Sequence, residues 1–147
     1  MEAVIFIGIQ ASGKSTFFRE RFFDTHVRVN LDMLRTRNRE KLLFEACLAA
    51  KQPFVVDNTN PTASDRARYI PAAKEAGFRV VGYYFRSSIA ECKERNAARE
   101  KPIPLPGLLG AHGKLEKPRL AEGFDRLHYV RISEEGQFDV EEWPDEV

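Results

Sequence analysis

The stretch that most constrains this chain is GIQASGKS, from Gly8 to Ser15, which directly follows the apolar run 3–7. It matches the phosphate-cradling pattern G-x-x-x-x-G-K-[ST]. In that pattern the glycines leave backbone N–H groups free to surround phosphate oxygens, Lys14 reaches the outer phosphates, and the Ser15 hydroxyl binds Mg²⁺. The stretch therefore predicts a strand before the loop and a helix after it, whose N-terminus favours an anion. The alternative is a strand-to-helix turn that holds no ligand.

We predict that this loop and the residue after it bind the phosphates of ATP, with Mg²⁺ as the accompanying metal. We expect Lys14 to face solvent when the loop is empty. The predicted nucleotide-binding residues here are Gly8, Ile9, Gln10, Ala11, Ser12, Gly13, Lys14, Ser15 and Thr16.

Apolar, β-branched stretches alternate with helical patterns along the rest of the chain. The expected strands are 3–7, 27–29, 54–56, 79–85 and 128–132, and the expected helices are 14–23, 33–50, 63–76 and 89–99. This alternation predicts an α/β fold in which a parallel sheet carries helices on both faces and presents ligands at the carboxyl ends of its strands. The Pro- and Gly-rich stretch 101–124 predicts a mobile loop near the site, because its prolines and glycines disfavour a long helix.

Length and charge indicate one domain with two electrostatically different parts. The 147 residues are enough for a single domain, 1–147. All 23 Lys and Arg lie in residues 1–132 together with 15 Asp and Glu, a net +8, whereas residues 133–147 carry −7. The basic part suits a polyanionic partner or an Arg-rich solvated surface. The acidic segment 133–147 predicts a solvated strand or tail that Phe138 and Trp143 dock on the body.

The N-terminal apolar run is too short for a signal peptide or a membrane span, so we expect a cytoplasmic protein with no membrane partner. Cys47 and Cys92 have no metal or redox spacing and are expected to be reduced.

Asp32 follows the second expected strand, where the sheet presents ligands. Its simplest role is a helix N-cap. A second interpretation pairs it with Arg35, three residues on, at neighbouring points of one helical face. Asp32 could then accept a proton from an incoming hydroxyl while Arg35 holds an anionic group of the same acceptor.

Asp57 follows the third expected strand, the position where phosphate-binding folds of this kind keep an acid close to Mg²⁺. We predict Asp57 and Ser15 as metal ligands; an Asx turn is the compatible structural interpretation of Asp57. Asn58 adds a hydrogen-bonding group for the substrate, and Arg66 and Arg68 are weaker candidates for phosphate contact.

Arg95 and Arg99 lie one turn apart on an expected helix that precedes the Pro/Gly-broken stretch. One interpretation is a solvated charged face. The other is a lid whose arginines contact the nucleotide and stabilise charge on the transferring phosphoryl group.

At these residues the chain resembles the polynucleotide 5′-hydroxyl kinases, in particular the P-loop kinase module of the bifunctional polynucleotide kinase/phosphatase. The matching stretches come in the family's order and cover most of residues 4–124. They are GIQASGKST, VNLD, DNTNPTASDRARYI, RNAARE and LEKPRLAEGF. The phosphate loop alone is shared by a very large superfamily, whereas DNTNP and AEGF are far more specific.

The resemblance implies a P-loop kinase fold, ATP and Mg²⁺ as co-substrates, and the 5′-hydroxyl of a nucleic acid, DNA or RNA, as acceptor. It also implies that Asp32 is the general base, that Arg35 contacts the acceptor phosphate, and that Arg95 and Arg99 belong to a lid. Leu31 stands where the family usually has arginine, and the chain has no Asp-x-Asp phosphatase signature. The alternatives are a P-loop kinase of a small-molecule hydroxyl acceptor and a non-catalytic ATP-binding module.

Overall fold

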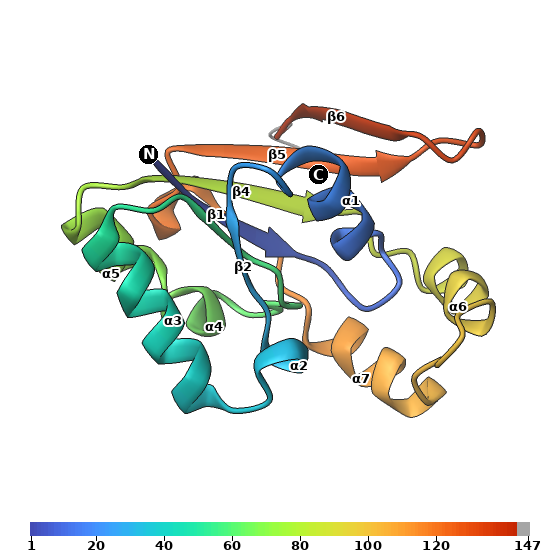
Figure 1. The fold of residues 1–147 in the computed structure, drawn as a ribbon. Helices are drawn as coiled ribbons and strands as arrows, with labels where there is room; N and C mark the ends of the chain where they lie inside the picture. Colours follow the sequence, from blue (N-terminus) through green and yellow to red (C-terminus); the bar gives the residue numbers. More distant parts are fainter. Residues whose placement is uncertain (144–147) are drawn as a thin grey trace.

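The structure, a computed structural model, describes residues 1–143 and is built on one six-stranded sheet, whose strands can be followed in Figure 1. The strand order across the sheet is β2-β3-β1-β4-β5-β6. The strands are β1 Glu2–Ile7, β2 Val27–Val29, β3 Phe54–Val56, β4 Arg79–Phe85, β5 Arg126–Ile132 and β6 Phe138–Glu142. The first five are parallel to one another and β6 runs antiparallel to β5. Parallel pairing brings the carboxyl ends of β1, β2 and β3 together at one edge.

The helices follow the strands in alternation, as the sequence predicts, but two expected helices are each divided. The helices are α1 Lys14–Arg21, α2 Leu31–Leu34, α3 Arg37–Ala50, α4 Ala63–Arg66, α5 Ile70–Glu75, α6 Ile89–Ala97 and α7 Leu105–Lys114, followed by the short 3-10 helix η1 Leu120–Glu122. The expected helix 33–50 is interrupted because Arg35 adopts a φ of 76° and Thr36 caps a new helix. The expected helix 63–76 is interrupted ahead of Pro71, which has no N–H to continue it and fits only the first turn of α5.

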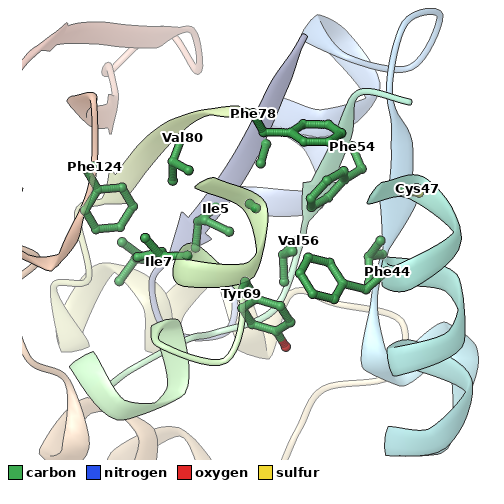
Figure 2. Packing of buried hydrophobic residues seen from close by; sticks show 14 of the residues in the cluster. Ile5, Ile7, Phe44, Cys47, Phe54, Val56, Tyr69, Phe78, Val80 and Phe124 are labelled. Atoms are coloured by element: carbon green, nitrogen blue, oxygen red, sulfur yellow. The ribbon is translucent and has the colours of Figure 1, made fainter. Parts of the chain in front are cut away.

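Layers of apolar side chains cover both faces of the sheet, as predicted. Alternate residues of β1 point to opposite faces. One face of the sheet is covered by α3 and α5. On this face the β1 residues Ala3, Ile5 and Ile7 belong to the same buried cluster as Phe44 and Tyr69 (Figure 2). The intervening residues of β1 pack against α1. These two layers hold the carboxyl ends of the strands, and the loops that leave them, in fixed positions.

The acidic segment forms an edge strand, one of its two predicted forms. β6 pairs with β5, and the ring of Phe138 lies 5.0 Å from that of Phe17. Trp143 contacts Tyr84, with ring centroids 5.3 Å apart. Both aromatic residues therefore dock the segment on the body as expected; its last residues, 144–147, lie outside the described part.

The expectation of a mobile loop over 101–124 is wrong for its first half, which forms α7. Leu108 is fully buried and packs with Ile9 and Cys92 beside the loop that follows β1. Its burial contributes roughly 2 kcal/mol, which offsets part of the cost of the glycines in the helix. Pro104 and Pro106 stand at the helix N-terminus, where a missing N–H costs nothing. No helix within residues 1–143 is long and apolar enough to cross a membrane.

Candidate active site

A cavity of about 890 Å³ opens at the carboxyl ends of β1, β2 and β3. Most of the residues predicted from the sequence lie on its wall. They are Gln10, Ala11, Gly13, Lys14, Ser15, Thr16, Asp32, Asp57, Asn58, Arg68, Arg95 and Arg99. Gly8, Ile9 and Ser12 belong to the same loop but stand behind this lining, and Arg35 and Arg66 are not on the wall.

The loop from Gly8 to Gly13 has no room for side chains at its two glycines. A Cβ at Gly8 would lie 2.8 Å from Ser12 Oγ and 3.0 Å from the Cβ of Phe85. Gly13 has a φ of 102°, and a Cβ there would lie 2.9 Å from the ring of Phe138. The close packing explains why the pattern requires glycine at both positions.

Two buried polar atoms of this loop, Gln10 Oε1 and Ser12 Oγ, have no hydrogen-bond partner within the described residues. Buried polar groups are normally paired, so each of these atoms calls for an explanation. A phosphate oxygen can accept from the Ser12 hydroxyl but cannot pair with the Gln10 amide oxygen, which is itself an acceptor.

Lys14 is buried, which corrects the expectation that its side chain faces solvent in the empty loop. Its Nζ donates to the carbonyl oxygens of Gly8, at 2.8 Å, and Ile9, at 2.9 Å. Burial lowers the pKa of Lys14 to about 8, although the Asp57 carboxylate opposes the shift. The direct partners of this ammonium group are two neutral carbonyl oxygens. A bound phosphate would supply the negative charge that a buried ammonium requires.

Asp57 and Ser15, the predicted metal ligands, lie side by side but share a third partner that the sequence prediction missed. Ser15 Oγ donates to Asp57 Oδ2 at 3.3 Å. Arg28 donates from Nε to the same carboxylate oxygen at 2.8 Å and from Nη2 to Ser15 Oγ at 3.0 Å. The signal for Arg28 was an arginine between two valines in the short strand β2, where a charged side chain needs a partner.

Within residues 1–143 no group of three or more His, Cys, Asp or Glu side chains could hold a metal ion. The Ser15 hydroxyl and the Asp57 carboxylate are nevertheless hard oxygen donors at the entrance of the phosphate loop, the set that suits Mg²⁺ bound with a nucleotide. The two side chains thus supply the donor type that Mg²⁺ takes, with the Arg28 guanidinium bonded to both as a competing cation.

Asp32 lines the cavity and its side chain is exposed. The N-cap of α2 is Asn30, whose side chain accepts a hydrogen bond from Met33 N at 2.9 Å, so the N-cap interpretation of Asp32 is wrong. Asn58 Oδ1 accepts the N–H of Leu31 at 2.8 Å and fixes the first turn of α2. Capping of α2 therefore does not occupy the carboxylate of Asp32, which is available for contacts within the cavity.

Arg35 does not stand beside Asp32 on one helical face, because α2 ends before it. The chain turns sharply at Arg35, and the cavity wall receives Arg37 from the start of α3 instead. Arg37 and Arg68 both line the cavity, together with Arg19, Arg28, Lys114 and the residues named above. Arg37 was not predicted, since its position depends on the turn that divides α2 from α3.

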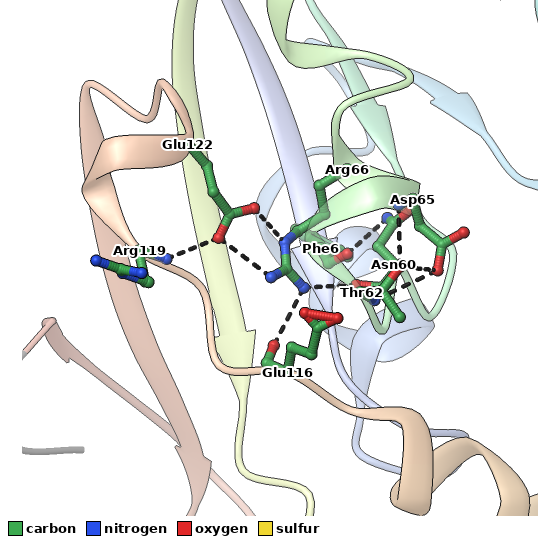
Figure 3. A network of polar contacts seen from close by, with 8 residues as sticks. All are labelled: Phe6, Asn60, Thr62, Asp65, Arg66, Glu116, Arg119 and Glu122. Atoms are coloured by element: carbon green, nitrogen blue, oxygen red, sulfur yellow. Dashed lines mark hydrogen bonds and ion pairs between the residues drawn. The ribbon is translucent and has the colours of Figure 1, made fainter.

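Arg66 is a structural residue rather than a phosphate contact. Its side chain is fully buried, with Nε and Nη2 donating to the Glu122 carboxylate at 2.7 and 3.1 Å (Figure 3). Its Nη1 donates to the carbonyl oxygens of Asn60, at 2.9 Å, and Glu116, at 3.1 Å. These bonds engage all three guanidinium nitrogens and tie residues 116–122 to the loop after β3.

Arg95 and Arg99, from α6 and the turn after it, both reach the cavity wall. Arg95 Nη1 donates to the carbonyl oxygen of Ala11 at 2.9 Å, so this side chain spans from α6 to the phosphate loop. A purely solvated charged face does not describe Arg95. The lid function of the two arginines stays a prediction.

A second group that the sequence prediction missed surrounds Glu40, whose side chain is 2% exposed. Its carboxylate accepts from Tyr69 OH, Arg37 Nη1 and Asn58 Nδ2, each at 2.8 Å. Burial, followed by the hydrogen bond to Glu40, raises the pKa of Tyr69 to about 12. Through Asn58, which also holds Leu31 N, this buried carboxylate connects α3 to the helix that bears Asp32.

A buried lysine next to a glycine-framed loop, at the carboxyl ends of parallel strands, is the arrangement of a nucleotide-binding P-loop. The fold and the site define a P-loop domain of the kinase type. The chain belongs to the family described as AAA domain, whose sequence profile matches residues 4–106.

The chain is distantly homologous to polynucleotide kinase, which confirms the resemblance seen in its motifs. It is 29% identical over 136 residues to the bifunctional polynucleotide phosphatase/kinase of Schizosaccharomyces pombe (strain 972 / ATCC 24843), covering 88% of this chain. It spans only 33% of that relative's length.

Two solved structures share the fold. A gluconokinase from Sinorhizobium meliloti 1021 superposes with a TM-score of 0.65 at 20% identity, covering 90% of this chain and 83% of that one. Chaetomium thermophilum Kti12 in complex with ADP-AlF3 gives a TM-score of 0.64 at 17% identity, with 91% and 92% covered. These likenesses confirm the predicted α/β P-loop kinase fold.

Proposed function

We propose that this domain transfers the γ-phosphoryl group of ATP to the 5′-hydroxyl of a polynucleotide. The observation that carries the proposal is the exposed Asp32 carboxylate, which lines the same cavity as Lys14 and the phosphate loop. The homology to a polynucleotide phosphatase/kinase supplies the class of acceptor. The proposal treats residues 1–147 as one kinase domain that includes the acidic segment 133–147.

On the nucleotide side, the backbone of the loop from Gly8 to Gly13 binds the phosphates and Lys14 neutralises the outer ones. Ser15 and Asp57 would hold Mg²⁺, which when bound supplies positive charge to the β- and γ-phosphate oxygens. Arg28 orients the Asp57 carboxylate through their 2.8 Å hydrogen bond.

On the acceptor side, Asp32 accepts the proton of the attacking 5′-hydroxyl. Arg37 and Arg68, which line this side of the cavity, bind the phosphate that follows the first nucleoside. Arg95 and Arg99 stabilise the charge that develops on the transferring group. A non-catalytic module has no use for a free carboxylate at this place, which favours a kinase.

A phosphoryl-transfer assay with labelled ATP and Mg²⁺ tests the proposal. The acceptors are a 5′-hydroxyl oligonucleotide, its 5′-phosphorylated twin, a bare nucleoside and small sugar acids. We expect label only on the 5′-hydroxyl oligonucleotide. Label on a sugar acid or equal labelling of the bare nucleoside would identify a small-molecule kinase, and no transfer with retained ATP binding would identify a non-catalytic module.

The variant Asp32→Asn sharpens this test. Because Asn30 is the N-cap of α2, the substitution leaves the cap intact and should change stability little. It removes the proton acceptor and should lower kcat by roughly 10²- to 10⁴-fold. Asp24→Asn, at an exposed position in the turn between α1 and β2 that does not line the cavity, is the matched control and should keep full turnover. Near-full turnover of Asp32→Asn would refute the role of the base.

A further inference from the structure

A second cavity, of about 570 Å³, lies between α3 and the segment from Arg68 to α5. We call it the α3–α5 groove. Its lining residues on α3 are Arg37, Glu40, Lys41, Phe44, Glu45 and Leu48, and those on the facing segment are Arg68, Tyr69 and Ala72. Arg37, Arg68 and Tyr69 line both this groove and the cavity that holds Asp32. The two spaces are therefore neighbours that share one wall.

The chemistry of the groove is divided between an apolar floor and a cationic rim. Phe44, Leu48 and Ala72 supply the floor; Phe44 and Tyr69 lie side by side there, with ring centroids 5.4 Å apart (Figure 2). Arg37 and Lys41 belong to the rim, with side chains 53% and 73% exposed.

The acids of the groove offset part of this positive charge. Glu40 is buried and forms an ion pair with Arg37 at 2.8 Å, and its carboxylate also accepts from Tyr69 OH and Asn58 Nδ2. Glu45 is 52% exposed and approaches Lys41 only to 3.8 Å, a contact that solvent screens. Arg68 adds a further exposed cation on the opposite wall. Three cations against two carboxylates leave the groove with a net charge of +1, and within the described residues Arg68 is its cation that forms no ion pair, so the groove favours an anionic occupant at Arg68.

An apolar floor below exposed cations suits a nucleotide, because a base is flat and apolar on its faces while its phosphate is charged. We propose that the α3–α5 groove binds a nucleotide of the acceptor strand downstream of the reacting 5′ end, with its base on the floor and the strand's phosphates at Arg37 and Arg68. This inference rests on the proposed function and assigns it a second subsite.

The shared wall sets the direction of the strand. The first nucleoside must lie in the larger cavity, since its 5′-hydroxyl has to reach Asp32. The strand then passes between Arg37 and Arg68, which line both spaces, before a base can enter the groove. The base that occupies the groove is thus the second or third from the 5′ end, and never the first.

The experiment uses single-stranded 5′-hydroxyl oligonucleotides that carry one abasic site at the first, second, third or fourth position. Direct binding is measured by anisotropy of a 3′ fluorophore, and KM and kcat by phosphoryl transfer. Phe44 and Tyr69 are only 6% and 2% exposed, so the base packs on the apolar floor without stacking on a whole aromatic face. Its removal at the second or third position should therefore raise the dissociation constant about 5-fold, the lower end of the roughly 1–3 kcal/mol that a stacked base contributes. An abasic site at the fourth position should have little effect.

The variant Ala72→Trp fills the groove and tests the same assignment from the protein side. It should weaken oligonucleotide binding and abolish the penalty of the abasic site, while the affinity for ATP stays unchanged. Ala46→Trp is the matched control, since Ala46 is exposed on α3 but does not line the groove. The abasic series on the unmodified protein decides the question even if Ala72→Trp does not fold.

The experiment separates a failure of the groove assignment from a failure of the proposed function. If 5′-hydroxyl ends are phosphorylated but no abasic site weakens binding, the groove does not hold a base. A groove that is occupied by a protein segment would give this result, and Ala72→Trp would then leave oligonucleotide binding unchanged. That outcome overturns the inference and leaves the proposed function intact. If no oligonucleotide is bound or phosphorylated, the proposed function itself fails, and the inference with it.

Discussion

Replacing Glu40 by Gln should destabilise the domain and misplace Asp32 at the same time. Glu40 Oε1 accepts from Tyr69 OH and Arg37 Nη1, and Oε2 accepts from Asn58 Nδ2. A glutamine amide has one acceptor oxygen and one donor group. Whichever way it is turned, its NH₂ faces at least one of these donors, so a buried hydrogen bond becomes a donor–donor contact.

The expected decrease in the free energy of unfolding follows from the hydrogen bonds that are lost. Hydrogen bonds to a charged acceptor are worth about 1.5–3 kcal/mol, and an unsatisfied buried donor costs about 1–3 kcal/mol. Glu40→Gln weakens all three bonds and breaks at least one, so we expect the free energy of unfolding to fall by about 3 kcal/mol. Tyr69→Phe removes a single donor and should cost about 1.5 kcal/mol. The double variant should lose less than the sum, because the two residues share a bond.

Urea unfolding followed by far-UV circular dichroism measures these differences. Glu45→Gln is the matched control: it lies on the same helix, is half exposed, and its ion pair with Lys41 is 3.8 Å long, so its effect should stay within about 0.5 kcal/mol. In kinase assays Glu40→Gln should also lower kcat, since Asn58 loses the partner that orients it against Leu31 N. A stability change as small as that of Glu45→Gln would refute the reasoning.

Three further predictions concern the phosphate loop and the arginines beside it. Lys14→Ala should abolish phosphoryl transfer in a domain that still folds, because the lysine supplies charge to the outer phosphates; a folded variant with normal turnover would contradict the P-loop assignment. Burial lowers the pKa of Lys14 from 10.5 to about 8, so between these pH values the unfolded chain binds more protons than the folded domain. The free energy of unfolding should therefore gain a contribution that rises with pH across this window, and urea titrations of Lys14→Met should lack it. Arg95→Ala and Arg99→Ala should lower kcat by on the order of 10³-fold with smaller changes in acceptor KM, whereas an effect on KM alone would make them binding residues.

The strands and the phosphate loop could be predicted closely because local chemistry determines them. β-branched and aromatic runs favour strands, and the loop pattern requires a strand before it and a helix after it. The helix interruptions were harder to predict, since they depend on the backbone turn at Arg35 and on the ring of Pro71. The helix α7 was missed because Leu108 gains its stability from Ile9 and Cys92, which are distant in sequence.

The site residues divide in the same way. Asp57 follows β3 directly, and Lys14 and Asp32 lie at the starts of the helices that follow β1 and β2, so the carboxyl edge of the sheet brings all three together. Arginine side chains are longer, so the position of each guanidinium group depends on which helix or turn carries the residue. Arg66 lies in a stretch typical of the kinase family, yet it is buried by Glu122, which comes 56 residues later and gives no local signal.

The cations on the acceptor side also bear on the leucine that replaces the family's usual arginine before Asp32. Leu31 lines the cavity without charge, and the N–H of its backbone is held by Asn58. Arg37 and Arg68, from α3 and the turn before α5, line both the cavity and the α3–α5 groove. In the proposed function these two cations contact phosphates downstream of the reacting hydroxyl, so we expect them to add affinity for an acceptor strand and not for a bare nucleoside.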